Sequence, residues 1–373
     1  VIIIFLAVMI TDVLLLDVFN TLGLPTSTTV SVIFSLLGAS VVLAVYKVYV
    51  SGDGFDTLGN YINTEKASEI VYSILLSVAL SFALGSLVQY VSRLIFTFHI
   101  EKRYKYVAAL FGGVAMTAIT FFILVKGLKS ITFVPSEVKD FIKESPFTII
   151  AYSLILWTIV CQLLISVFKY SVFKFIIIVG TFGLALAFAG NDLVNFIGVP
   201  IAAYQAFEIW AAPGQTVGAT EFMMSGLEKE NLPAPFIFLA LAGLVMVYTL
   251  WTSKKAKSVI ETEQNLSRQG EGNEKYNANT LSRNLVRAMM YLGNIISFIL
   301  PKSLQRKLDA QFVQPEYTGK RDEQPMFDMV RASVNLIVAS ILISIGTSMK
   351  LPLSTTYVTF MVAMGSSFAD RAW

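Results

Sequence analysis

The sequence predicts an all-α, polytopic transmembrane helical bundle with an inverted-topology repeat and broken or re-entrant helices. Three observations lead to this class. Of the 373 residues, 55% are hydrophobic and only 14% are charged, whereas soluble domains are about one quarter charged. The apolar residues gather in runs close to the roughly 20 residues that cross a bilayer. The motif Pro-x-Ser-Thr-Thr occurs twice inside such runs, at 25–29 and 352–356.

The apolar segments follow one another along the chain, separated by polar loops. They cover 1–19, 25–50, 67–98, 106–125, 146–168, 175–210, 234–252, 327–349 and the run that opens with the second motif. Segment 175–210 is too long for a single pass and contains Gly190 and Pro200, so we expect it to break there or to re-enter the membrane. Both ends of the chain lie in or near apolar runs, and we expect the chain to be truncated at both ends.

The order of motifs and loops predicts the following division of the chain. Residues 1–50 form part of a first inverted repeat and carry the first motif, and 51–174 hold connecting transmembrane helices. Residues 175–252 begin the second repeat. A polar cytoplasmic linker covers 253–325, with an amphipathic stretch that lies along the membrane surface, and 326–373 completes the second repeat.

Loop charges orient the segments by the positive-inside rule. The loops after 67–98, 146–168 and 234–252 are basic, and those after 25–50 and 175–210 are acidic. Placing the basic loops inside satisfies all of these charges at once, and it sets the two motif-bearing segment pairs in opposite orientations. Inverted repeats of this kind are typical of secondary transporters. We expect a multi-pass protein of the cell (cytoplasmic or inner) membrane.

Each Pro-x-Ser-Thr-Thr copy is typical of a helix start. Proline suits the first turn because the N–H it lacks would be unpaired there, and Ser and Thr oxygens cap free backbone N–H groups. A single copy is more often a kinked helix, but the duplication favours a site. Helix starts at membrane depth bind anions without a charged side chain. The predicted anion-binding residues are Ser27, Thr28, Thr29, Ser354, Thr355 and Thr356.

A second polar cluster, Asn191, Asp192 and Asn195, interrupts segment 175–210. Such side chains are costly in lipid and should face a protein interior or cavity. Gly190 allows the helix to unwind and expose backbone carbonyls. Carboxylate, amide and carbonyl oxygens are ligands of hard cations, so the cluster predicts a coupling-cation site, with Na⁺ at Asp192 and Asn195. An anion site beside a cation site predicts a cation-coupled anion symporter.

Gly190-Asn191-Asp192-x-x-Asn195, together with the duplicated Leu-Pro-x-Ser-Thr-Thr, resembles the inorganic phosphate transporter (PiT) family. The family signature is a duplicated Gly-Ala-Asn-Asp-Val-Ala-Asn element, each copy followed later by Pro-x-Ser-Thr-Thr. The resemblance implies symport of inorganic phosphate with Na⁺ or H⁺. The family usually has His after Thr-Thr, where this chain has Val30 and Tyr357. The first Asn-Asp element is absent, and we expect it upstream of Val1.

Two alternatives differ in substrate or in class. Helix termini favour negative charge without naming the anion, so a symporter for another oxyanion such as sulfate stays open. An intramembrane enzyme is disfavoured because the chain has one His and no base near Ser27 or Ser354. The expected partners are inorganic phosphate, Na⁺ or H⁺ and membrane lipid; the net charge of +3 is too small to indicate nucleic acid. The oligomeric state is open, with a homo-oligomer as one option.

Other charged residues in apolar segments match no family motif. For Asp12 and Asp17 we favour a structural role, such as pairing with helix ends, over a place in the transport pathway. Asp328, Arg331 and Asn335 have spacings of three and four residues, which place them on one helix face and predict a local salt bridge.

Overall fold

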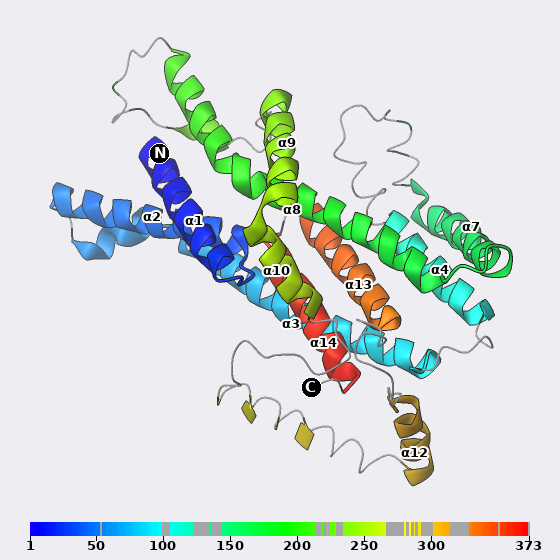
Figure 1. The fold of residues 1–373 in the computed structure, drawn as a ribbon. Coiled ribbons are helices and arrows are strands. Elements are labelled where there is room, and N and C mark those ends of the chain that lie inside the picture. Colours follow the sequence, from blue (N-terminus) through cyan, green and yellow to red (C-terminus); the bar gives the residue numbers. More distant parts are fainter. Residues whose placement is uncertain are drawn as a thin grey trace.

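A computed structural model gives the fold of the chain (Figure 1). It describes residues 1–52, 54–98, 105–121, 144–213, 234–265, 301–313, 328–349 and 351–371, with scattered positions within 135–140, 218–228 and 280–291. All regular secondary structure in these residues is helical, which confirms the predicted all-α class. Most of the expected amphipathic stretch at 281–300 lies outside the described residues.

The described helices are α1 (Ile2–Thr21), α2 (Thr28–Ser51), η1 (Phe55–Asn60), α3 (Thr64–Ile95), α4 (Lys105–Thr120), α7 (Pro146–Ser166), α8 (Val172–Ala211), η4 (Ser225–Glu228), α9 (Phe236–Thr252), α10 (Lys254–Asn265), α12 (Lys302–Gln311), α13 (Met329–Ser348) and α14 (Thr355–Ala369). In this part of the chain six helices, α1, α2, α3, α7, α8 and α13, are long and apolar enough to cross a membrane. The protein is therefore a multi-pass membrane protein.

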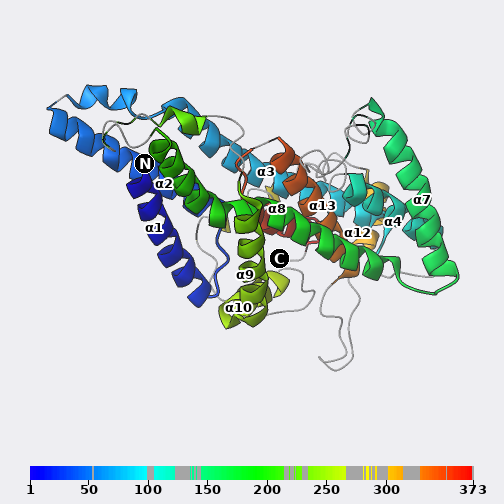
Figure 2. The ribbon, with the colours of Figure 1, turned by 90° about the horizontal axis from the view of Figure 1, so that it is seen from above.

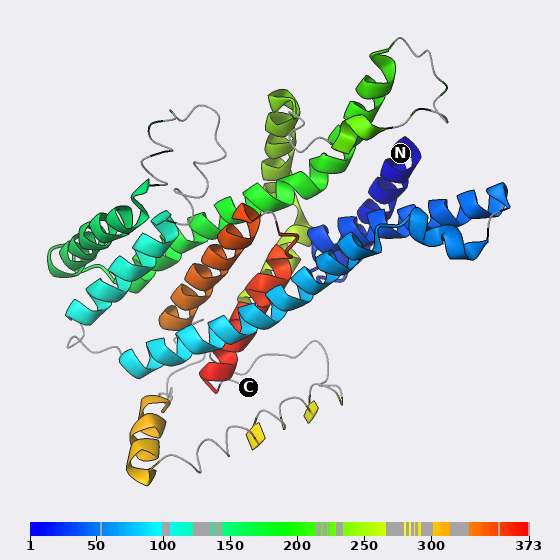
Figure 3. The same cartoon turned by 180° about the vertical axis from the view of Figure 1, so that it is seen from behind.

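The long helix α8 runs through the middle of the molecule. It contacts α13 near its beginning, through Gly180 and Leu336, and it contacts α1 and α2 through Val199. Helix α3 runs along the other side, with α13 and α14 between the two long helices (Figure 3). Helices α4 and α7 lie at one end of this elongated arrangement and α1 and α2 at the other (Figures 1 and 2).

One apolar cluster brings several helix ends together. Phe96, just after α3, packs with Ala108 of α4, Phe173 of α8 and Val330 of α13. The end of α3 and the beginnings of the other three helices therefore lie at the same end of the bundle. The loop charges predict that these ends are on the cytoplasmic side.

The break expected within segment 175–210 is not found. Helix α8 is helical over 40 residues, through both Gly190 and Pro200. Proline removes one backbone hydrogen bond and bends a helix, but neighbouring turns can continue past it. Figure 1 shows α8 changing direction along its length. Side chains, rather than freed carbonyls, must therefore supply the polar groups near Asn191. A sharp bend is found instead between α9 and α10, whose axes differ in direction by 72°.

Helices α3 and α14 approach each other closely because glycines line their contact. A Cβ atom on Gly85 would lie 2.6 Å from the backbone oxygen of Val362, and one on Gly365 would meet the backbone of Phe82 and Ser86. The Ser86 hydroxyl also donates to the Gly365 carbonyl at 2.9 Å. Small residues permit this backbone contact between membrane helices, and the contact positions α14 against α3.

The substitutions Gly85→Ala and Gly365→Ala are each expected to lower the thermal unfolding temperature of the protein in detergent. Overpacking of such a contact costs typically about 1–3 kcal/mol. Gly38→Ala in α2 is the matched control, because a Cβ there meets nothing within 4 Å and alanine is the better helix former. Equal unfolding temperatures for Gly365→Ala and Gly38→Ala would contradict the close packing.

Candidate functional site

The two Pro-x-Ser-Thr-Thr copies begin α2 and α14 in the same way. Ser27 is the N-cap of α2, and its Oγ accepts the Val30 N–H at 3.1 Å. Ser354 is the N-cap of α14, and its Oγ accepts the Tyr357 N–H at 3.0 Å. The predicted helix starts are confirmed. The prolines lie two residues before each cap, outside the first helical turn where we expected them. Serine takes the capping position instead, and its side-chain oxygen accepts a free N–H of the first turn.

These two helix starts converge on the carboxylate of Asp192 in α8. The Thr28 hydroxyl donates to Asp192 Oδ1 at 3.3 Å, and Thr355 Oγ1 lies 3.1 Å from each Asp192 oxygen. The Thr356 hydroxyl donates to the backbone oxygen of Thr26 at 3.2 Å, so the two motif loops also touch directly. Segments from both ends of the chain therefore meet on α8.

The asparagines of the α8 cluster bind the first motif. Asn195 Nδ2 donates to Thr29 Oγ1 at 2.7 Å and to Thr28 Oγ1 at 3.3 Å, and Asn191 Nδ2 donates to Thr29 Oγ1 at 3.3 Å. Both amide nitrogens also lie within hydrogen-bond reach of Asp192 Oδ1, at 3.4 and 3.5 Å. These three side chains point the same way because positions three and four apart are neighbours on a helix.

The structure thus places all of the predicted site residues in one cluster. Its members are Ser27, Thr28, Thr29, Asn191, Asp192, Asn195, Ser354, Thr355 and Thr356. The two serines lie in it as helix caps, and their hydroxyl hydrogens remain able to donate. The roles of these residues in binding stay predictions. We call this set of nine residues the hydroxyl–amide cluster.

The electrostatics of the hydroxyl–amide cluster favour negative charge. The N-termini of α2 and α14 each carry roughly half a positive elementary charge, and hydroxyl and amide groups add hydrogen-bond donors. In the described part of the chain, Asp192 forms no ion pair with lysine or arginine. The Asp192 carboxylate therefore accepts hydrogen bonds from the same hydroxyl groups that an external oxyanion would need.

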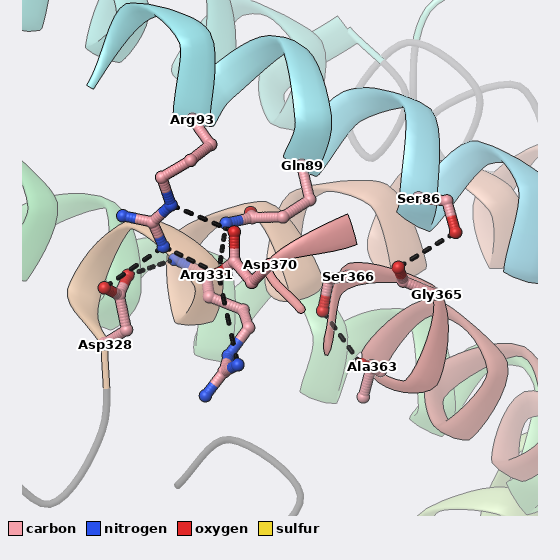
Figure 4. Close-up of polar contacts among 9 residues, drawn as sticks. All are labelled: Ser86, Gln89, Arg93, Asp328, Arg331, Ala363, Gly365, Ser366 and Asp370. Carbon is pink, nitrogen blue, oxygen red and sulfur yellow. Dashed lines mark hydrogen bonds and ion pairs between the residues drawn. The ribbon is translucent and has the colours of Figure 1, made fainter. Parts of the chain in front are cut away.

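A second polar cluster lies where α3, α13 and α14 meet (Figure 4). Arg93 Nε and Nη2 donate to the two oxygens of Asp370 at 2.9 and 2.6 Å, and Gln89 Nε2 donates to the same carboxylate at 2.9 Å. Arg93 Nη2 is also 3.2 Å from Asp328 Oδ2, and Arg331 Nη1 is 4.0 Å from Asp370. Asp328 caps α13 and Asp370 ends α14, so α13 and α14 form a hairpin whose two ends lie together.

Sequence reasoning missed the partners in this buried charge cluster. The local salt bridge predicted on one face of α13 stays a prediction, and the Asp328 carboxylate also pairs with Arg93 of α3, which the sequence did not indicate. Arg93 and Asp370 are 277 residues apart. The sequence shows only that Arg93 and Asp370 are charged residues near the ends of apolar segments, and this does not identify which residue each one pairs with.

Comparisons with known proteins come from sequence and from structure. Residues 1–263 match the model of the Phosphate transporter family. Curated proteins show no match. A solved structure described as "The sodium-dependent phosphate transporter" is similar at a TM-score of 0.56 with 19% identity, over 98% of this chain and 70% of that chain. The family match includes the first motif and Asn191 to Asn195, whereas the second motif lies beyond it.

Proposed function

The chain belongs to the phosphate transporter family, and from this premise we propose that it is a symporter that moves inorganic phosphate with Na⁺ across the cell membrane. The observation that carries the proposal is the meeting of both Pro-x-Ser-Thr-Thr helix starts at Asp192. The family is one of transporters and not of enzymes, and no step of covalent chemistry is needed from these residues.

Phosphate fits the donors of the hydroxyl–amide cluster. Its oxygens accept hydrogen bonds from hydroxyl groups such as those of Thr28 and Thr355, and the positive ends of α2 and α14 offset part of its charge. Hydroxyl groups here act as neutral donors and not as nucleophiles. The same donors suit sulfate, so the family membership is what favours phosphate.

The coupling ion fits the oxygens of the α8 cluster. The Asp192 carboxylate and the amide oxygens of Asn191 and Asn195 are hard ligands for Na⁺. The hydroxyls of Thr28 and Thr355 now donate to Asp192, so phosphate and this carboxylate compete for them. A cation bound at Asp192 compensates its charge and frees those donors for phosphate. Cation and phosphate binding are thereby coupled, and neither is favourable alone.

We further propose that the hairpins α1–α2 and α13–α14 belong to the two halves of an inverted repeat. The support is their matching serine caps and the meeting of their tips on α8. Movement of one half against the other would expose the shared site alternately to the two sides of the membrane.

Uptake of radiolabelled phosphate into proteoliposomes tests the proposed function directly. We expect an inward Na⁺ gradient to drive uptake above the level of empty liposomes, and excess sulfate to leave it unchanged. Phosphate uptake equal to that of empty liposomes, with or without the gradient, would contradict the proposal. Strong inhibition by sulfate would instead favour the broader oxyanion symporter, and an H⁺ gradient is the parallel arm for the coupling ion.

Thr355→Ala is expected to raise the KM for phosphate roughly tenfold, because one hydrogen bond to a charged group contributes about 1.5–3 kcal/mol. Thr359→Ala is the matched control, one turn further along α14, where the hydroxyl donates to the backbone oxygen of Thr355 at 2.9 Å. We expect its KM to stay near that of the wild type. Similar KM values for both variants would argue against a role of Thr355 in binding.

A further inference from the structure

Helix α1 buries one narrow face, and that face carries a carboxylate. Its buried residues are Val8 and Asp12, which lie one turn apart on the same side. This side faces α2 and α8, where Val8 packs with Val32 and Val199. An ionisable residue on a face that a membrane helix turns toward protein is a candidate for function.

The Asp12 carboxylate faces Ser31 of α2. Asp12 is 3% exposed and Ser31 is 8% exposed. The two side chains are close enough to interact, yet Asp12 Oδ1 and Ser31 Oγ have no hydrogen-bond partner in the part of the chain described by the structure. Two buried oxygens thus face each other where α1 packs against α2, and each of them lacks a hydrogen bond among the described residues.

Asp17, on the same helix, shows the contrasting arrangement. Its side chain is 63% exposed and pairs with Lys255 of α10 at 2.5 Å. A charged carboxylate can be kept there, since solvent and a lysine compensate it. Asp12 has neither, and a buried charge without a partner is strongly unfavourable. The group must therefore bind a cation, and the smallest is a proton.

The surroundings favour a proton over a metal ion. Metal cations need a shell of several oxygens, whereas here one carboxylate and one hydroxyl face each other beside Val8, Val32 and Val199. A proton on Asp12 needs only one acceptor, which the Ser31 oxygen provides. Protonation removes the charge, and it gives the carboxyl group an O–H that can donate to the Ser31 oxygen.

The charged groups of the helices packed against α1 do not provide an alternative partner. Those helices are α2, α8 and α10. Their charged residues with described side chains are Lys47, Lys174, Asp192, Glu208, Lys254, Lys255, Lys257 and Glu261, and their tyrosines are Tyr46, Tyr49 and Tyr204. Lys255 is paired with Asp17, and Lys47 lies over the ring of Tyr61. Among the described groups, none forms an ion pair with Asp12.

The pair lies close to the hydroxyl–amide cluster. Ser31 follows Thr28 by three residues of α2, about 4.5 Å along the helix, and Thr28 donates to Asp192. A negative charge on Asp12 therefore opposes a bound oxyanion. At a separation of about 10 Å and an effective dielectric constant near 20, the repulsion changes affinity by on the order of tenfold.

We propose that Asp12 and Ser31 form a proton-binding site, and that protonation of Asp12 favours phosphate binding at the neighbouring hydroxyl–amide cluster. The proton site stands on the buried oxygens alone, whereas its effect on phosphate rests on the proposed function. Phosphate affinity then rises as the pH falls, because the neutral form of Asp12 no longer repels the anion.

Carbodiimide labelling of the full chain in proteoliposomes tests the proton site without transport. Dicyclohexylcarbodiimide reacts with protonated carboxyl groups in apolar surroundings, and peptide mass spectrometry locates the adduct. We expect labelling of Asp12 that decreases as the pH rises and is unaffected by Na⁺ at constant ionic strength, with Asp17 unlabelled as the internal control. Ser31→Ala should shift that pH profile. Absence of label on Asp12 at every pH, or its suppression by Na⁺, would overturn the proton site.

Phosphate uptake tests the second part. Asp12→Asn keeps the shape of the side chain and removes its charge. In the wild type we expect the titration of Asp12 to change the KM for phosphate by about tenfold, and in Asp12→Asn we expect this contribution to be absent. Asp17→Asn makes the same charge change at the exposed position and should keep the wild-type profile. The titration of phosphate itself affects all three proteins equally. An unchanged pH profile in Asp12→Asn would refute the coupling. Failure of the proposed function would appear differently, as absence of uptake in the wild type with Asp12 still labelled.

Discussion

Asp192→Asn is expected to abolish Na⁺-driven phosphate uptake, by at least about 100-fold, and to leave the protein folded. The asparagine has nearly the same shape, so Thr28 and Thr355 keep an oxygen acceptor at this position. The negative charge that would hold the coupling cation is lost, and removing one partner of a buried charge interaction costs roughly 2–5 kcal/mol. Initial rates of radiolabelled phosphate uptake in proteoliposomes measure the effect.

A matched control is available on the same helix. Glu208→Gln makes the same charge change on α8 at an exposed position, and we expect normal uptake from it. Competition between phosphate and Asp192 gives a second expected result: equilibrium phosphate binding to Asp192→Asn should no longer depend on Na⁺. Wild-type rates in Asp192→Asn, or an equal loss in Glu208→Gln, would rule out the coupling role.

The second large effect concerns the stability of the buried charge cluster. Asp370→Ala is expected to lower the free energy of unfolding by about 3–5 kcal/mol, because it leaves Arg93 buried without its bidentate partner. Arg93 and Asp370 are both fully buried. The double variant Arg93→Met/Asp370→Ala removes one charge of each sign, and we expect it to be more stable than Asp370→Ala alone.

Unfolding in detergent, followed by the loss of helical signal, measures these differences. The adjacent pair of Arg371 and Asp309 provides the control, since it has a similar distance of 2.8 Å but side chains that are 53% and 60% exposed. Asp309→Ala should change stability by at most about 1 kcal/mol. If Asp370→Ala were no more destabilising than Asp309→Ala, the charge cluster would not be what holds α14 against α3. Since α14 begins at Thr355, its displacement should also slow phosphate uptake.

Much of the candidate site could be predicted because its signals are local. A serine followed by two threonines after a proline indicates a helix start through the chemistry of a few neighbouring groups, and both starts are present at Ser27 and Ser354. Asn191, Asp192 and Asn195 stand out because polar side chains are rare in apolar runs. Because the helix continues here, their spacing places Asn195 one turn from both Asn191 and Asp192.

The behaviour of α8 could not be predicted in the same way. Gly190 and Pro200 are signals of a helix break in isolation, but the helix continues through both. Contacts along α8 on either side of Gly190, to α13 at Gly180 and to α1 and α2 at Val199, stabilise the helical conformation. Such support comes from distant parts of the chain and is not visible in the local pattern.

Local patterns in the chain are enough to predict a multi-pass, all-α membrane protein, the starts of α2 and α14, and the polar residues that are candidates for a site. The packing of distant segments is what brings residues about 160 positions apart together at Asp192, pairs Arg93 with Asp370, and buries Asp12 while Asp17 is exposed. The physical reason is that capping and hydropathy act over a few residues. A membrane helix such as α1 is apolar on every side, so its sequence pattern cannot show which face packs against protein.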